Sequence, residues 1–280
     1  MQNSQPIKIE DGVSIAPDCL EIFKKAGLDS IDGVFTFSAG TELAKSNIGS
    51  HRTRIVFDLD GRTFYLKRYR NTPKLTQIKS WISHGKKAST ASFDRGPADK
   101  LASANIDTPK TASSGEEWKN GFESRSFIIT ENLYGCESLE KRLPSCFDGS
   151  TNKHKQRCEF ISSLADFARR FHDTGLRHRD FYLSHIFLSE TGRLFLIDLQ
   201  RVFEPALLSE RFRVKDIAQL HYSTDGRLVS CADRIRFYKR YAGISRLSSA
   251  DKRFIKKVKS KAWRMADHDI RHGRSVPFAQ

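Results

Sequence analysis

Apolar and polar positions alternate through much of the first half of the chain. Residues 53–59 and 63–69 each alternate with a period of two and are joined by the turn DLDGRT at 58–63, which predicts an antiparallel hairpin. VFTF at 34–37 predicts a further strand, and the apolar run 126–133 predicts a buried strand that ends in an exposed segment. Alternation along 63–69 sends Phe64 and Leu66 to one face and Lys67 to the other.

Helical spacing takes over in the second half. Residues 153–174 carry an apolar face and stop at Gly175, and residues 205–222 and 231–242 predict two more helices. The apolar face of 153–174 consists of Phe160, Ile161, Leu164, Phe167, Ala168 and Phe171. In the first half, residues 74–87 predict a short basic amphipathic helix, because apolar residues recur at helical spacing and lysines fill the other face. Its apolar residues are Leu75, Ile78, Trp81 and Ile82.

A β-rich front half followed by an α-rich back half is typical of a two-lobed α+β protein. We predict an antiparallel β-rich N-terminal lobe at 1–132, a mainly helical lobe at 133–244 and a basic helical tail at 245–280. In the tail, Phe254, Val258, Ala262 and Met265 form an apolar stripe beside a dense row of lysines. That stripe either packs onto the second lobe and leaves the lysines in water, or accompanies lysines that meet anionic lipid.

Composition narrows the class of protein. The five cysteines form no C-x-x-C pair, which favours reduced thiols and a cytosolic location over a zinc site or a disulfide framework. No basic, apolar leader begins the chain and no run of 18 apolar residues occurs, so we expect neither secretion nor a membrane span. The net charge of +15 predicts an anionic partner: nucleic acid, phospholipid headgroups or a phosphorylated substrate. No nucleic-acid-binding motif is recognisable, so nucleic acid is not the partner we expect.

The segment 176–202 carries the candidate chemistry. Apolar strands at 186–189 and 194–197 flank a loop at 190–193 that contains glycine, which predicts a hairpin. If Ser189 pairs with Leu194, Ile186 lies opposite Ile197, and His185 lies opposite Asp198 with Cβ atoms ~5 Å apart. Asp180 then lies on a loop at the mouth of the same hairpin.

Two carboxylates and an imidazole in this grouping suit phosphoryl transfer. One carboxylate, Asp180, would orient and deprotonate an acceptor hydroxyl, while Asp198 and His185 would hold a metal ion against the phosphates. An isolated H-R-D, here His178, Arg179 and Asp180, is a weak signal, and a lone Asp after a strand is often a turn cap. The order H-R-D, a ligand five residues on, a strand and then I-D is that of protein-kinase-like enzymes.

An ATP-binding half of the site is expected upstream. Lys67, on a strand that follows a hairpin, stands where kinases place the lysine that grips the phosphates. Asp94 is the preferred acidic partner over Asp99, although Gly96-Pro97 threatens helix continuity there. A flap over the phosphates is expected at 40–52, without a full G-x-G-x-x-G. Where the apolar strand ends, Glu131 and Leu133 are placed to offer backbone groups to adenine.

From about Arg52 to Tyr241 the chain resembles the lipopolysaccharide kinase (Kdo/WaaP, InaA-like) family of Gram-negative bacteria. The elements that carry the likeness are FYLKRYR, SFIITENL, HRDFYLSHIFL, LIDLQRV and RVKDIAQLHYS. The resemblance implies a bilobal protein-kinase-like fold, ATP with Mg²⁺ or Mn²⁺ as cofactors, and phosphorylation of an inner-core sugar, Kdo or heptose. By the same likeness Lys67 binds ATP, Asp180 is the base, His185 and Asp198 complete the metal site, and Asp216 braces the catalytic loop.

Two departures from kinase patterns affect these expectations. Asp94 stands where the family usually has Glu, and His185 replaces the asparagine of protein kinases, a replacement that the family shares. Imidazole is a poor ligand for Mg²⁺, so His185 would act through water or favour Mn²⁺. No D-F-G or A-P-E frames the short segment between Asp198 and Asp216, which argues against a regulated protein kinase.

Three hypotheses remain. The first is a kinase of lipid A-core glycolipid, peripheral to the inner face of the cytoplasmic membrane. Its membrane contact would use 74–87 and 245–280, where ten Lys or Arg stand against three Asp, a net charge of +7. The second is a soluble kinase of the aminoglycoside or choline type, for whose cationic substrates a basic surface is unfavourable. The third is a non-catalytic pseudokinase or nucleic-acid-associated module, which turnover of ATP would exclude.

Overall fold

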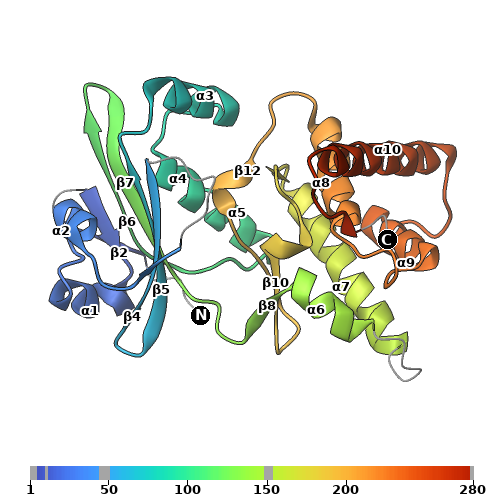
Figure 1. Ribbon diagram of the computed structural model, residues 1–280, viewed down its shortest axis with the longest axis horizontal. Coiled ribbons are helices and arrows are strands. Elements are labelled where there is room, and N and C mark those ends of the chain that lie inside the picture. The colour runs from blue at the N-terminus through green and yellow to red at the C-terminus, as the bar shows by residue number, and fades with distance from the viewer. Residues whose placement is uncertain (1–4, 10–11, 44–50, 148–153, 278–280) are drawn as a thin grey trace. The chain divides into compact units, whose positions relative to one another are not determined.

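The computed structural model describes residues 5–9, 12–43, 51–147 and 154–277, and Figure 1 traces their helices and strands. The chain divides into two compact units. Unit 1 comprises residues 1–97 and 109–133, and unit 2 comprises residues 98–108 and 134–280. Residues 98–108, which the sequence analysis placed in the first lobe, therefore belong to the helical unit, and so does the basic tail.

Unit 1 is built on a seven-stranded antiparallel sheet. Across the sheet the strands run β1 (Ile7–Lys8), β2 (Val13–Ile15), β6 (Thr111–Lys119), β7 (Phe122–Glu131), β5 (Arg62–Arg70), β4 (Arg52–Leu59) and β3 (Thr41–Glu42). The β4–β5 hairpin is confirmed. Its turn residues, Asp60 and Gly61, both take positive φ, 51° and 71°, as a tight two-residue hairpin turn requires.

The two faces of this sheet are covered by different helices. Phe64 and Leu66 lie in the core formed with α1 (Leu20–Lys25) and α2 (Ile31–Thr36). Tyr69 packs on the other face with residues of β7 and α4 (Thr90–Arg95). The alternation expected for 63–69 is therefore confirmed, and it leaves Lys67 on the α4 side.

The strand expected at 34–37 is wrong, because residues 31–36 form the helix α2. The Ser30 side chain accepts a hydrogen bond of 3.0 Å from the Gly33 N–H and so caps the helix. Ile31, Val34 and Phe35 then recur at helical spacing and are all buried. A cap and a buried face thus outweigh the strand propensity of the valine and phenylalanines.

The flap expected at 40–52 is described only in part, since residues 44–50 with Gly49 lie outside the described residues. Gly40, at its start, has φ of 106°. A Cβ there would overlap the carbonyl oxygen of Val56, so the pairing of β3 with β4 requires glycine at this point.

Helix α3 (Lys74–His84) ends at Gly85, which takes the left-handed conformation with φ of 66°. The helix is confirmed, but its apolar side does not face the core. Gln77 is buried, whereas the Leu75 and Ile82 side chains are exposed. Gln77 thus anchors the inner side of α3, while aliphatic side chains lie on its outer side.

Unit 2 is mainly helical, and the helices expected at 153–174, 205–222 and 231–242 are confirmed with small shifts of their ends. Its helices are α5 (Ala98–Ser103), α6 (Leu139–Cys146), α7 (His154–Asp173), α8 (Ser209–Tyr222), α9 (Cys231–Ala242) and α10 (Ser249–Arg271). Two small antiparallel sheets, β11-β10-β8 and β12-β9, hold the loops that carry the candidate chemistry. Their strands are β8 (Cys136–Ser138), β9 (Arg177–His178), β10 (Ile186–Ser189), β11 (Leu194–Leu196) and β12 (Val202–Phe203).

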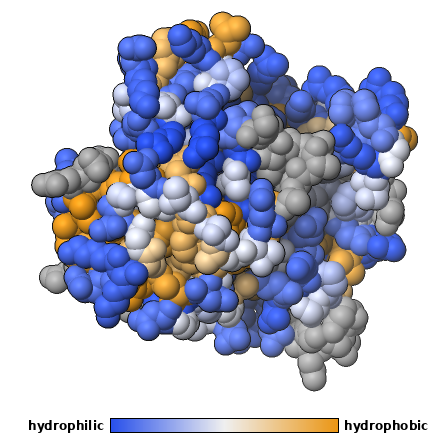
Figure 2. All heavy atoms as spheres, turned by 60° about the vertical axis from the view of Figure 1, so that its left-hand side comes forward, coloured by the Kyte–Doolittle hydropathy of each residue, from blue (hydrophilic) through white to orange (hydrophobic). Residues whose placement is uncertain are grey.

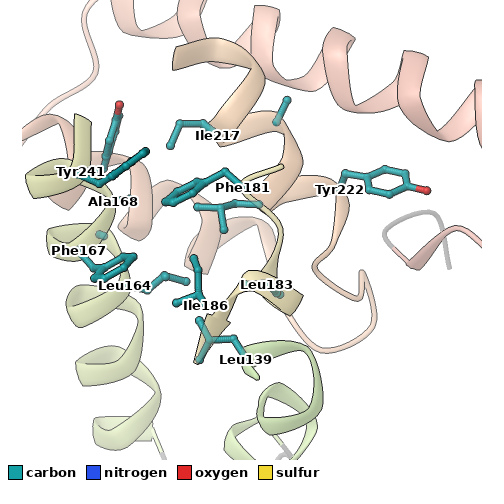
Figure 3. Packing of buried hydrophobic residues seen from close by; sticks show 14 of the residues in the cluster. Leu139, Leu164, Phe167, Ala168, Phe181, Leu183, Ile186, Ile217, Tyr222 and Tyr241 are labelled. Atoms are coloured by element: carbon teal, nitrogen blue, oxygen red, sulfur yellow. The ribbon is translucent and has the colours of Figure 1, made fainter. Parts of the chain in front are cut away.

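The core of unit 2 joins these helices and sheets. Figure 3 shows Phe167 of α7, Ile186 of β10 and Ile217 of α8 among the side chains around Phe181. The ring of Phe181 is fully buried and stacks on Phe171 with 5.1 Å between ring centroids. Because Phe181 directly follows the H-R-D residues, this packing anchors the loop that carries them.

The tail stripe packs within unit 2. Phe254, Val258 and Ala262 of α10 are buried in its core, and α10 lies along α8. Lys256, Lys257 and Lys259 remain exposed. The helix therefore owes its position to apolar packing, which leaves these lysines at the surface.

Candidate active site

The lysine expected to grip phosphates is paired with an acid from α4. Lys67 Nζ lies 2.5 Å from Asp94 Oδ2, and the two side chains are 18% and 6% exposed. Asp94 lies in the last turn of α4, which ends at Arg95 before Gly96-Pro97. The helix thus ends before Gly96-Pro97, as anticipated, and it ends just after the residue that pairs with Lys67.

The position of α4 is fixed by two residues of β7 that were not anticipated from the sequence. Glu123 is buried and accepts hydrogen bonds from the Thr90 N–H at 2.9 Å and the Thr90 hydroxyl at 2.7 Å. The Ser126 hydroxyl accepts from the Ala91 N–H at 3.2 Å. Burial raises the pKa of the Glu123 carboxyl, while the bonds from Ser126 and Thr90 act in the opposite direction. These bonds satisfy the first amides of α4 and so hold Asp94 in reach of Lys67.

Glu131 and Leu133 lie where the chain leaves unit 1. The Glu131 carboxylate is held by Arg62 through two hydrogen bonds of 2.9 and 2.8 Å, so this side chain has a structural partner. Its backbone N–H donates to the Lys110 carbonyl, and the Asn132 N–H donates to the Thr63 carbonyl. Any contact of Glu131 with adenine would therefore use its backbone carbonyl, and Leu133 is half-buried beside it.

In unit 2, His178 is a buried structural member of the H-R-D loop. Its Nδ1 accepts the Asp180 N–H at 3.1 Å, so its Nε2 carries the proton and donates to the Ile197 carbonyl at 3.1 Å. Burial lowers the pKa of His178 to about 4, and the ring is neutral at physiological pH. His178 thus ties the backbone of the expected base to the residue that precedes Asp198.

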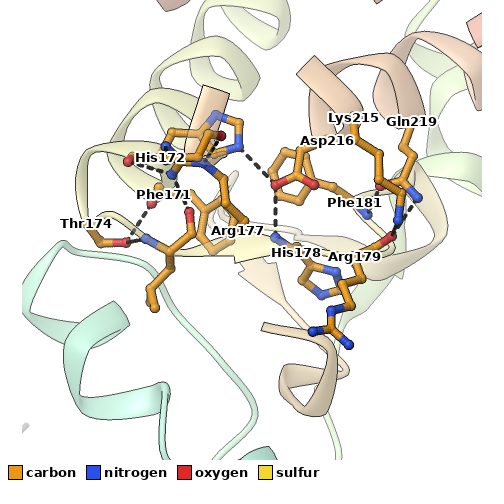
Figure 4. A network of polar contacts seen from close by, with 12 residues as sticks. Phe171, His172, Thr174, Arg177, His178, Arg179, Phe181, Lys215, Asp216 and Gln219 are labelled. Carbon is orange, nitrogen blue, oxygen red and sulfur yellow. Dashed lines mark hydrogen bonds and ion pairs between the residues drawn. The ribbon is translucent and has the colours of Figure 1, made fainter. Parts of the chain in front are cut away.

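Asp216 braces the loop from α8, as Figure 4 shows. Its Oδ2 accepts the His178 N–H at 2.9 Å and lies 3.2 Å from Nε2 of His172, whose Nδ1 is 2.7 Å from the Tyr241 hydroxyl. Burial raises the pKa of Asp216 and holds that of His172 well below its usual range. His172 is therefore a neutral ring that donates to Asp216 and accepts from Tyr241, and neither His172 nor Tyr241 was anticipated from sequence.

A second clamp from α8 grips the backbone of Arg179. Its carbonyl accepts from Lys215 Nζ at 2.6 Å and from Gln219 Nε2 at 2.7 Å, and Gln219 Oε1 accepts the Phe181 N–H at 3.0 Å. The Arg179 guanidinium lies over the ring of Phe203, 4.4 Å from its centroid. Arg179 therefore serves as a brace, and the K-D-x-x-Q spacing on one helix face places all three α8 contacts.

Asp180 itself remains accessible. Its side chain is 28% exposed, and Oδ2 accepts a hydrogen bond of 2.7 Å from Nε of Arg201. Its backbone carbonyl accepts from the Tyr182 N–H at 2.9 Å and from Nδ1 of His185 at 2.7 Å. A carboxylate whose backbone is fixed on both sides and whose side chain reaches solvent has the placement that a general base needs.

The predicted hairpin register is wrong by one residue. Ile186 pairs with Leu196 and Leu188 with Leu194, so His185 is opposite Ile197, not Asp198. The loop is three residues long, because Gly192 takes φ of 81° and lets Arg193 close onto Ser189.

Asp198 follows β11 in the left-handed conformation, with φ of 57°. This conformation is costly for a non-glycine residue and recurs at functional sites. The chain turns there into the short 3₁₀ segment Leu199–Arg201, which carries the arginine that reaches Asp180.

His185 and Asp198 carry the donor types that a metal ion shared with substrate phosphates would need, although the two residues are not opposite each other in the hairpin. Because Nδ1 of His185 donates to the Asp180 carbonyl at 2.7 Å, Nε2 is the ring nitrogen left to ligate a metal ion. Among the described residues no group of three or more His, Cys, Asp or Glu side chains is arranged around one point. One or two protein ligands are what Mg²⁺ usually takes when phosphates supply the rest.

An antiparallel sheet with a Lys–Asp pair, together with a helical unit that carries a braced H-R-D loop and an I-D turn, defines a kinase of the protein-kinase-like fold. A solved structure described as WaaP in complex with acyl carrier protein has the same fold: its TM-score is 0.64 at 22% identity, and the match covers 87% of this chain and 96% of that one.

The family model for the lipopolysaccharide kinase (Kdo/WaaP) family matches residues 47–241, and the chain belongs to this family. It is a phosphotransferase that acts on a sugar hydroxyl.

The curated relatives that match the chain include proteins named lipopolysaccharide core heptose(I) kinase WaaP. The protein of Escherichia coli (strain K12) is 30% identical over 233 residues, which cover 79% of this chain and 87% of the relative. That of Pseudomonas aeruginosa is 25% identical over 191 residues, which cover 66% and 71%. Within the described residues, no helix is both long enough and apolar enough to span a bilayer.

Proposed function

We propose that this protein transfers the γ-phosphoryl group of ATP to a hydroxyl of an inner-core sugar of lipopolysaccharide, with Asp180 as the general base. The observation that carries the proposal is the bracing of the Asp180 loop by His178, Asp216 and Gln219 around an accessible carboxylate. The acceptor sugar is heptose or Kdo, and the names of the relatives favour heptose.

The roles of the individual residues follow from their positions. Asp180 accepts the proton of the attacking hydroxyl and orients its oxygen toward phosphorus. Lys67, held by Asp94, supplies a positive charge to the phosphates of ATP from unit 1. Asp198 and Nε2 of His185 would hold Mg²⁺ or Mn²⁺, which when bound neutralises charge on the phosphates. The backbone at Glu131 and Leu133 is where we place adenine.

Asp180→Asn tests the base assignment. We expect phosphate transfer from ATP to a core glycolipid, located by mass spectrometry, to fall by at least about 100-fold while nucleotide affinity is kept, because only the proton acceptor is lost. Asp173→Asn, at an exposed carboxylate at the end of α7, is the matched control and should retain activity. A near-normal rate for Asp180→Asn, or transfer to free aminoglycosides or choline but not to glycolipids, would contradict the proposal.

We also place the protein at the cytoplasmic face of the inner membrane, where its glycolipid acceptor is made. The exposed lysines of α10 support this placement, since each Lys near an anionic surface contributes ~1 kcal/mol. Replacing Lys256, Lys257, Lys259 and Lys261 by Gln should reduce liposome binding and glycolipid phosphorylation at low salt, with ATP affinity and Tm nearly unchanged. Equal co-sedimentation of the variant and the native protein would reject a membrane role for these lysines.

An acyl carrier protein is a second partner that we propose. The observation that favours it is an apolar cavity of about 600 Å³ within unit 2, lined by Leu143, Phe147, Leu164, Ile217 and Leu220 among others. Such a cavity suits a hydrocarbon chain like the one an acyl carrier protein bears. Co-purification with acylated carrier protein, lost on replacing Leu164 by Trp, is the expected result. Equal affinity for acylated and unacylated carrier protein would remove the cavity from the interaction.

A further inference from the structure

Helix α3 presents an aliphatic ridge to solvent. The side chains of Leu75, Ile78 and Ile82 are 72%, 37% and 77% exposed. At ~100° per residue these three positions fall within an arc of about 60° on the helix surface. The ridge is therefore a continuous line of aliphatic side chains along one side of α3.

The direction of the ridge is fixed by the opposite side of the helix. Gln77 Nε2 donates to the carbonyls of Thr72 at 2.8 Å and Glu123 at 3.0 Å, and its Oε1 accepts the Glu123 N–H at 2.9 Å. The Trp81 indole N–H donates to the Ala88 carbonyl at 2.8 Å, and its ring stacks on Phe122. With a buried polar anchor and a stacked aromatic on one side, α3 cannot roll to hide its aliphatic side without breaking these bonds.

The segment that carries the ridge is positively charged. Residues 74–87 contain four lysines and neither Asp nor Glu. Lys74 lies over the ring of Phe122 and Lys87 over that of Trp81, at 5.1 and 5.2 Å from the ring centroids, so both ammonium groups stay close to the helix. Figure 2 shows hydrophobic residues (orange) among hydrophilic ones (blue) at the top of the view, the end at which α3 and the β6–β7 hairpin lie in Figure 1.

We propose that α3 is a membrane-insertion element, with Leu75, Ile78 and Ile82 entering the acyl-chain boundary of an anionic leaflet and the lysines contacting its headgroups. A protruding aliphatic ridge on a segment whose formal charges are all positive is complementary to a phospholipid surface, apolar below and negative at the headgroups. An acidic protein would satisfy the lysines but gain less from a convex ridge than from a groove. This binding needs neither ATP nor acceptor, so it is separate from the proposed kinase activity.

Co-sedimentation with vesicles tests the proposal on the full chain. We expect binding to phosphatidylglycerol-containing vesicles and little binding to pure phosphatidylcholine. Leu75→Ser with Ile82→Ser should weaken binding at least about ten-fold, since apolar burial is lost while every charge is kept. Lys74→Gln with Lys79→Gln should weaken it by about 30-fold at low salt, which is ~2 kcal/mol at ~1 kcal/mol per lysine.

Matched controls show whether weaker vesicle binding comes from lost insertion of the ridge or from another cause. Leu207→Ser with Leu208→Ser removes two aliphatic side chains that are 80% and 62% exposed outside α3, and it should bind like the native protein. The ridge variant should keep its Tm, because its side chains are in water, and should phosphorylate detergent-dispersed acceptor at the native rate.

The loss of vesicle binding in the ridge variant should also persist at high salt. In the lysine variant the loss should shrink, because salt screens the charges. Native binding by the ridge variant, or failure of the native protein to bind anionic vesicles while it binds an acidic protein, would overturn the proposal. If the native protein binds anionic vesicles but shows no kinase activity, that result would count against the proposed function alone.

Discussion

Replacing His178 by Gln should change how the stability of the protein depends on pH. In the native protein the His178 ring is fully buried, accepts the Asp180 N–H at Nδ1 and donates from Nε2 to the Ile197 carbonyl. Burial lowers its pKa to about 4, against about 6.5 for an exposed histidine. The cationic ring has a proton at Nδ1, so it can no longer accept the Asp180 N–H.

The sign and size of the effect follow from proton linkage. Because the folded-state pKa is the lower one, the unfolded chain takes up the proton first, and stability contributed by the neutral ring is complete above about pH 6.5. It is lost as pH falls toward about 4, where the folded protein also becomes protonated. At 1.36 kcal/mol per pKa unit the whole effect is about 3 kcal/mol, of which a little under half is lost between pH 7.5 and 5.5 and most by pH 4.5.

Urea unfolding at pH 7.5, 6.5, 5.5 and 4.5 measures this contribution as the difference between the native protein and His178→Gln. The variant should be less stable at pH 7.5, and the gap in unfolding free energy between the two proteins should narrow by roughly 2–3 kcal/mol at pH 4.5. Burial also lowers the pKa of His172 and His221, but both residues are present in both proteins and cancel in the difference. His154→Gln, at an exposed ring, is the control and should parallel the native protein at every pH. A constant gap between His178→Gln and the native protein would refute the buried, neutral assignment of His178.

Three further outcomes follow from the site. Lys67→Met should weaken ATP binding and destabilise unit 1 by roughly 1–3 kcal/mol, because it removes the cation that faces buried Asp94. Adding Asp94→Asn should restore part of this stability but no activity. If urea unfolding shows no recovery in the double variant, the pair does not stabilise the protein. Asp198→Ala should abolish metal-dependent nucleotide binding, and the same Mg²⁺ requirement in isothermal titration of the variant would contradict a ligand role. Arg201→Gln should lower kcat by roughly ten-fold, because Asp180 loses the partner that orients it. KM for ATP and Tm should be almost unchanged, since the Arg201 side chain is 43% exposed. An unchanged kcat would show that Asp180 needs no such partner.

The sheet of unit 1 was predictable where local signals were strong. The β4–β5 hairpin has a two-residue turn of Asp60 and Gly61 and clean alternation, so both its register and the face of Lys67 follow from the sequence. The segment around Phe35 was mistaken for a strand because the β-branched and aromatic residues at 34–37 favour one, whereas the helix depends on the Ser30 cap and on buried packing. The partner of Lys67 was correctly chosen by its place in the chain, although the Glu123 and Ser126 bonds that hold α4 had no signal in the sequence.

In the catalytic loop, the residues were identifiable but their geometry was not. The hairpin at β10–β11 was expected with a four-residue loop, and the positive φ of Gly192 shortened that loop and shifted the register, so His185 does not face Asp198. One residue of slip reverses every side chain of a strand, which is why turn geometry matters more here than composition.

The sequence by itself determined the class of this protein and its candidate base, because a hairpin lysine, an H-R-D loop and an I-D turn recur in a fixed order along one chain. Tertiary structure alone decided which groups act as braces. His172 and Tyr241 are 69 residues apart, and Asp216 is 38 residues from the backbone N–H of His178 that it accepts, so only packing of α7, α8 and α9 brings them together. It also decided that the aliphatic side of α3 faces water. Periodicity shows that a helix has an apolar side, but the hydrogen bonds of Gln77 determine which side is buried.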